Sequence, residues 1–77
     1  MSTIRVTVLR DGDPVDGHRV VIEFSGIDGG LSQAEYTGSD GIAEFDVEGN
    51  RDGDVFVDGA NVSQWNTSSA TDITVNL

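Results

Sequence analysis

Residues 4–14 read IRVTVLRDGDP, and this stretch decides the fold. Ile4, Val6 and Val8 stand at every second position, which is the pattern of a strand that buries one face. The Asp-Gly pair that follows favours a tight turn, and Pro14 removes a donor from any further ladder of hydrogen bonds. This pattern, a half-buried strand followed by a tight turn, indicates that the chain is built from β-strands.

The rest of the 77-residue chain repeats this alternation between glycine-rich breaks. Ten valines against three leucines and four alanines favour strands over helices. All ten glycines fall between the alternating segments, where glycine supplies the positive φ angles of turns. Loops are expected over residues 25–30 and 65–69, and a strand over residues 31–37. Short strands at this spacing predict a single all-β domain over residues 1–77, a small seven-stranded antiparallel sandwich without a long helix. The residues expected to face its core are Ile4, Val6, Val8, Val20, Ile22, Phe24, Ala34, Tyr36, Ala43, Phe45, Val47, Val55, Val57, Ile73, Val75 and Leu77.

The turns between residues 4 and 59 follow a particular order. In residues 6–22 a strand, an Asp-Pro-Val-Asp-Gly turn and a second strand follow one another. Residues 37–45, TGSDGIAEF, place a threonine, an Asp-Gly turn, a small residue and an aromatic residue in sequence, and residues 55–59 end a glycine-bounded hairpin. This order resembles prealbumin-like domains, which include the carboxypeptidase regulatory-like and transthyretin-like modules. The resemblance implies an Ig-like or prealbumin-like sandwich.

Two activities of the relatives can be compared with this sequence. The transthyretin-like hydroxyisourate hydrolases need several histidines and a Tyr-Arg-Gly-Ser-type C-terminus, whereas this chain has His18 alone and ends in Thr-Val-Asn-Leu. The Lys–Asn isopeptide cross-link of related surface adhesins requires a lysine, and the chain has none. His18 also lacks a nucleophile elbow of the Gly-x-Ser-x-Gly type. We therefore expect an exposed structural histidine and no enzymatic activity.

Fourteen acidic residues against four arginines give the chain a net charge of −10, which repels nucleic acid and anionic lipid. The absence of cysteine excludes disulfides and thiolate metal sites. Ten aspartates without any lysine resemble the composition of proteins from salt-loving organisms, because molar salt screens the repulsion between carboxylates. No apolar segment has the length of a signal peptide or a membrane span. The expected location is the cytoplasm, a virion or another assembly.

The aspartates gather at the predicted turns. If successive strands run antiparallel, alternate loops share one end of the sandwich, and Asp11, Asp13, Asp16 and Asp40 lie there together with Asp58. Calcium takes six to eight oxygen ligands, so the first four of these residues are the candidate calcium ligands. The alternative is that these aspartates serve as turn residues, in which case no cofactor is bound.

Several apolar residues fall outside the predicted core. Val21 and Phe56 stand on the outer faces of their strands, and Trp65 stands in a predicted polar loop. Because exposed apolar patches mark interfaces, Val21, Phe56 and Trp65 are candidate interface residues. For Trp65 the alternative is a plug over the small core. We expect a non-catalytic interaction or assembly module that associates with itself or with a protein partner. The alternative is a module that binds calcium or carbohydrate through its acidic loops.

Overall fold

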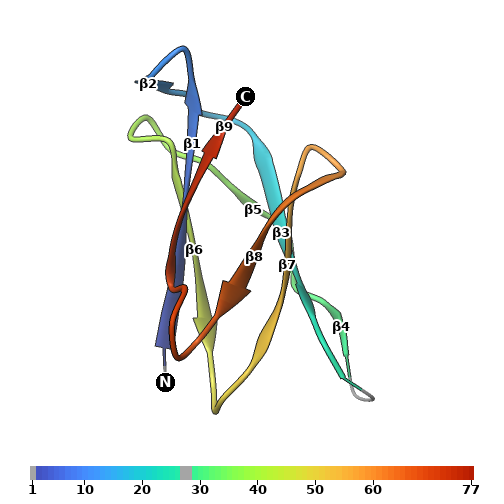
Figure 1. Cartoon of the computed structure of the whole chain (residues 1–77). Helices are drawn as coiled ribbons and strands as arrows, with labels where there is room; N and C mark the ends of the chain where they lie inside the picture. Colours follow the sequence, from blue (N-terminus) through green and yellow to red (C-terminus); the bar gives the residue numbers. More distant parts are fainter. Residues whose placement is uncertain (1, 27–28) are drawn as a thin grey trace.

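The computed structural model describes residues 2–26 and 29–77, and these residues form nine β-strands in two sheets (Figure 1). The four-stranded sheet contains β1 (Ser2–Arg10), β2 (Asp13–Pro14), β6 (Ile42–Val47) and β9 (Asp72–Asn76). The five-stranded sheet contains β3 (Arg19–Phe24), β4 (Gly30–Leu31), β5 (Glu35–Tyr36), β7 (Asp52–Val57) and β8 (Ala60–Asn66). The described residues include no helix, which confirms the all-β prediction. Accordingly, no helix in these two ranges is long and apolar enough to cross a membrane.

Two short elements raise the number of strands from the predicted seven to nine. β2 pairs with the end of β1 in a hairpin that the sequence predicts only as a turn. The strand predicted over residues 31–37 is instead divided into β4 and β5, which both pair with β3. Between them, the Ser32 hydroxyl accepts the N–H of Ile22 at 3.0 Å, and the Ser32 N–H donates to the Ile22 carbonyl at 2.8 Å. A side chain thus takes the place of a backbone acceptor and interrupts the regular ladder. The predicted loop over residues 25–30 includes residues 27–28, which lie outside the described residues.

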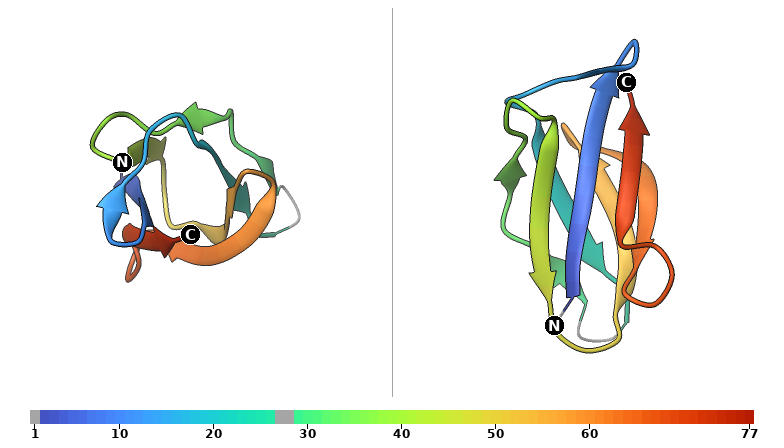
Figure 2. Two further views of the ribbon diagram at one scale, coloured as in Figure 1. Left: turned by 90° about the horizontal axis from the view of Figure 1, so that it is seen from above. Right: turned by 90° about the vertical axis from the view of Figure 1, so that its left-hand side faces the viewer.

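The direction of β9 differs from the prediction. β1 is central in its sheet and runs antiparallel to β6 but parallel to β9, with Arg5 opposite Asp72 and Leu9 opposite Asn76. The chain reaches β9 by crossing from β8 in the other sheet, so these two consecutive strands form no hairpin (Figure 2). A period of two shows which face of a strand is buried but not which way the strand runs. The expectation of antiparallel pairing throughout was therefore wrong at this pair.

One core lies between the two sheets, at alternating positions of the long strands. Its buried residues are Ile4, Val6, Val8, Val20, Ile22, Ala43, Phe45, Val47, Val55, Val57, Trp65, Ile73 and Val75, with Val15 and Phe24 packed against them. Leu77 follows the end of β9 and is 43% exposed rather than buried. The sheets curve toward each other, so that β5 lies near β6 and β8 lies near β9 (Figure 2). The gap between the two sheets is therefore narrow along both sides of the core.

The alternation predicts that Tyr36 faces the core and Thr37 the surface, but the structure has them the other way round. Tyr36 is 62% exposed, because it pairs with Arg19 on the outward side of β3. Thr37 is buried instead. Its hydroxyl donates to the Val15 carbonyl at 2.8 Å and accepts the His18 N–H at 3.0 Å. These two hydrogen bonds hold the connection between β2 and β3 against the residue that follows β5.

Candidate functional site

The outer face of the five-stranded sheet carries a cluster of apolar side chains. Val21 of β3 and Phe56 of β7 are direct cross-strand partners, and Leu31 of β4 lies opposite Glu23 of β3. Residues 20 and 22 point into the core, so their neighbours on β3 point outward, because successive side chains of a strand alternate between its faces. Together these outward residues form a shallow hollow of about 300 Å³. This apolar hollow is lined by Arg19, Val21, Glu23, Leu31, Phe56 and Gly59.

The three apolar residues of the hollow differ in exposure. Leu31 is 66% exposed, Phe56 is half-buried, and Val21 is only 4% exposed. Val21 is therefore the floor of the hollow, and Leu31 and Phe56 are its accessible walls. The prediction that Val21 and Phe56 lie on an outer sheet face agrees with this placement, but Val21 itself is covered by its neighbours and is not an exposed contact residue.

Two carboxylates face each other directly beside the apolar hollow. Glu23 of β3 and Asp54 of β7 are cross-strand partners, one outward position along from the pair of Val21 and Phe56. Both side chains are half-buried, and neither forms an ion pair with any residue of the described ranges. Like charges that stand directly opposite each other on a sheet are destabilising. We call these two residues the carboxylate pair.

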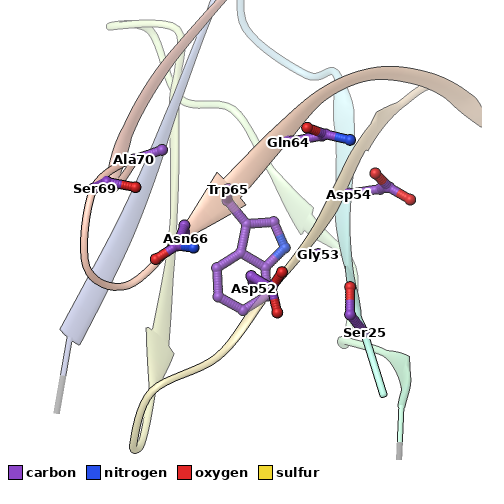
Figure 3. A pocket seen from close by; sticks show the side chains of 9 residues that line it. All are labelled: Ser25, Asp52, Gly53, Asp54, Gln64, Trp65, Asn66, Ser69 and Ala70. Atoms are coloured by element: carbon purple, nitrogen blue, oxygen red, sulfur yellow. The ribbon is translucent and has the colours of Figure 1, made fainter. Parts of the chain in front are cut away.

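Trp65 does not belong to this surface, which corrects its assignment as an interface residue. It lies near the end of β8 rather than in a loop, and it is 1% exposed. Its indole Nε1–H donates to the Glu23 carbonyl at 3.1 Å, and its ring is nearly perpendicular to that of Phe24, at a centroid distance of 5.3 Å. The indole lies over Gly53, its cross-strand partner (Figure 3). The alternative expectation, a tryptophan that closes part of the core, describes this arrangement.

The same view shows a polar depression next to the carboxylate pair (Figure 3). Asp52 and Asp54 of β7 line it together with Ser25, Gln64 and Asn66. Asp52, Asp54, Gln64 and Asn66 stand at outward positions of β7 and β8, so the depression extends the acidic character of the sheet face away from the apolar hollow.

The predicted calcium ligands share one end of the molecule but are not assembled into a site. The loops that carry Asp11, Asp13, Asp16 and Asp40 lie at the end where the hairpin of β1 and β2 stands (Figure 1). Among the described residues, however, no three His, Asp or Glu side chains come close enough together to hold a metal ion. The expected convergence of these four aspartates is therefore not found.

Turn geometry accounts for two of these aspartates. Asp11 and Gly12 are the two central residues of the β1–β2 hairpin, with φ angles of 52° and 83°. Positive φ at both central positions defines a type I′ turn, for which Asp-Gly is a preferred pair. The Asp40 carboxylate accepts the N–H of Ile42 at 3.0 Å and so closes its own turn.

His18 is half-buried and paired, whereas the sequence predicts an exposed histidine. Its Nδ1 lies 2.7 Å from Asp58 Oδ2, and the other oxygen of Asp58 accepts the Arg19 N–H at 3.3 Å. The hydrogen bond from His18 holds the pKa of Asp58 below its usual value. Asp58 begins the β7–β8 turn with a φ of 52°, so the pair fastens this turn to the start of β3.

Comparison with known proteins adds no relative: no family model, curated protein or solved structure matches the chain. The sequence alone does not single out Glu23, Leu31 and Asp54 as residues of this surface. A signal for the carboxylate pair is present, because Glu23 follows Val21 by two positions and Asp54 precedes Phe56 by two. Antiparallel pairing of Val21 with Phe56 places these carboxylates opposite each other, but the sequence does not reveal that register.

Proposed function

We propose that the protein is a non-catalytic interaction or assembly module and that the outer face of its five-stranded sheet is the surface that binds another protein. The observation that carries this proposal is the apolar hollow, in which Leu31 is 66% exposed beside the half-buried Phe56. Apolar patches rimmed by polar residues mark protein interfaces. Here Arg19 and Glu23 supply the polar rim.

The fold that we propose for this module is a prealbumin-like or Ig-like sandwich. Two sheets with a single core between them support this assignment, as does the order of the turns. Sandwiches host many functions, so the proposal for the binding surface stands on the residues of the sheet face and not on the fold. The acidic composition further suits a salt-rich environment, in which screening relieves the repulsion of a chain with a charge of −10.

The alternative of a module that binds calcium or carbohydrate has less support. Among the described residues, the four candidate calcium ligands are not part of any group of three or more His, Asp or Glu side chains that could hold a metal ion. A sugar-binding surface often offers an exposed aromatic ring for stacking, but the indole of Trp65 is inside the core, and the exposed ring of Tyr36 lies on β5 rather than in an acidic loop. The interaction module is therefore the function that we carry forward.

The proposal is tested by placing a charge in the hollow. Phe56→Asp is compared with Leu77→Asp, which adds the same charge at an exposed apolar residue beyond β9 in the other sheet. Self-association is measured by sedimentation over a range of concentrations. Binding is measured with peptides selected on the wild-type chain from a random 12-residue display library.

We expect Phe56→Asp to abolish the association or the peptide binding, and Leu77→Asp to preserve both. A wild-type chain that stays monomeric at high concentration, and whose selected peptides bind both variants equally, would overturn the proposal. The melting temperatures of both variants show whether the fold has been preserved.

A further inference from the structure

We infer that the partner of the apolar hollow is a basic protein segment, which presents an aromatic or aliphatic anchor next to an arginine or a lysine. This inference rests on the proposed function and specifies the chemistry of the partner.

Two neighbouring cross-strand pairs on the outer face define the chemistry of this partner. Val21 lies opposite Phe56, and the carboxylate pair of Glu23 and Asp54 is the next outward pair along the same two strands. Two residues along a strand span roughly 7 Å, so a single short segment covers both pairs. An apolar anchor and a polar group on such a segment therefore meet the hollow and the carboxylate pair at the same time.

Docking on this face requires a positive charge, because the carboxylate pair has no ion-pair partner within residues 2–26 and 29–77. Any segment that covers the hollow also removes water from Glu23, which lines it. Burying a carboxylate without a partner is costly, and here two carboxylates stand directly opposite each other. A guanidinium or ammonium group from the partner offsets this cost, and an arginine additionally offers a fork of donors that matches carboxylate oxygens.

Neither Arg19 nor Arg51 forms an ion pair with Glu23 or Asp54. Arg19 lines the opposite side of the hollow, two residues before Val21. Arg51 lies over the Phe24 ring, 4.8 Å from its centroid. A second copy of the chain is a poorer occupant than a basic partner, because it adds a further charge of −10 and offers the single guanidinium of Arg19 to two carboxylates.

The experiment uses the full chain, immobilised, and the random 12-residue peptide library. Selected peptides are synthesised, and their dissociation constants are measured for the wild type and three variants. Glu23→Gln/Asp54→Asn removes the carboxylate pair with little change in shape. Asp11→Asn/Asp13→Asn removes the same charge at the tip of the β1–β2 hairpin and is the matched control. Phe56→Asp disables the hollow.

We expect the selected peptides to carry an arginine or a lysine within a few positions of a large apolar residue. Their affinity is expected to fall about tenfold in Glu23→Gln/Asp54→Asn and to stay within about twofold in the control. Added salt should weaken binding to the wild type and to the control more than to the variant without the carboxylate pair.

The other outcomes separate this inference from the proposed function. Peptides without basic residues that still require Phe56 would overturn the inference and support the proposed function. Self-association through Phe56 at low salt would do the same, since the occupant would then be a second copy. Binding that is insensitive to all three variants would overturn both.

Discussion

Replacing Gly53 with alanine is expected to separate β3 from β7 and to destabilise the whole fold. A Cβ atom at this position would overlap the carbonyl oxygen of Glu23 and lie 3.0 Å from the indole nitrogen of Trp65. The Glu23 carbonyl belongs to the backbone of a paired strand, and the Trp65 indole is packed in the core, so neither group can move away from the added Cβ atom. The methyl group therefore displaces both the strand and the hydrogen bond from Trp65 to Glu23.

The magnitude follows from these contacts. Overpacking of a core costs about 1–3 kcal/mol, and each lost hydrogen bond adds about 0.5–1.5 kcal/mol. With one or two hydrogen bonds lost, the total is roughly 2–6 kcal/mol. A chain of this length has a total stability of roughly 4–12 kcal/mol, so the variant loses a large part of it.

The assay is urea denaturation followed by circular dichroism, at a fixed high salt concentration. Gly30→Ala is the control, because a Cβ atom at that position of β4 meets no atom of the described residues within 4 Å. Its free energy of unfolding should stay within about 1 kcal/mol of the wild type. A Gly53→Ala variant as stable as Gly30→Ala would refute the placement of the indole over Gly53 and the close approach of β3.

Trp65→Phe keeps a buried ring but removes the donor to the Glu23 carbonyl, so we expect a loss of about 1–3 kcal/mol in urea denaturation; a surface tryptophan would show almost none. The hydrogen bond from His18 lowers the pKa of Asp58 from 3.8, so its stabilising effect is present above that value and is lost as the pH falls through the lowered pKa. The difference in urea midpoint between the wild type and Asp58→Asn should therefore shrink on acidification below about pH 4, and a constant difference would contradict the pairing. Because the charge is −10, the melting temperature should rise from low to molar potassium chloride, and a flat trend would count against the salt-rich environment. Calcium and magnesium at equal ionic strength should raise the melting temperature equally if Asp11 and Asp40 serve as turn residues, whereas a larger effect of calcium would restore a specific site.

The long strands could be predicted from the sequence, but the short strands and the strand directions could not. Ile4, Val6 and Val8 alternate over a complete strand, and the structure buries all three. The segment 31–37 offers few alternating positions, and the hydrogen bonds of Ser32 to the backbone of Ile22 divide it into two strands. The parallel pairing of β1 with β9 depends on a crossing between the sheets, which leaves no trace in the periodicity.

The candidate site was predictable to the same limited extent. The outward positions of Val21 and Phe56 follow from alternation alone. The carboxylate pair depends on the register of two strands that lie about thirty residues apart, and the contact of His18 with Asp58 joins residues 40 positions apart. Trp65 was misplaced because the polar residues that follow it resemble a loop, whereas its cross-strand partner is a glycine that leaves room for the indole.

If the outer face of the five-stranded sheet binds a protein partner, amide chemical-shift mapping will locate the contact on that face. The full chain, labelled with nitrogen-15, is titrated with the tightest peptide selected from the library. We expect the largest shifts on Arg19–Glu23, Leu31 and Asp54–Phe56, and we expect them to vanish in Phe56→Asp. Shifts concentrated on β1 and β9, or on the turns that hold Asp11 and Asp40, would contradict the proposed binding face.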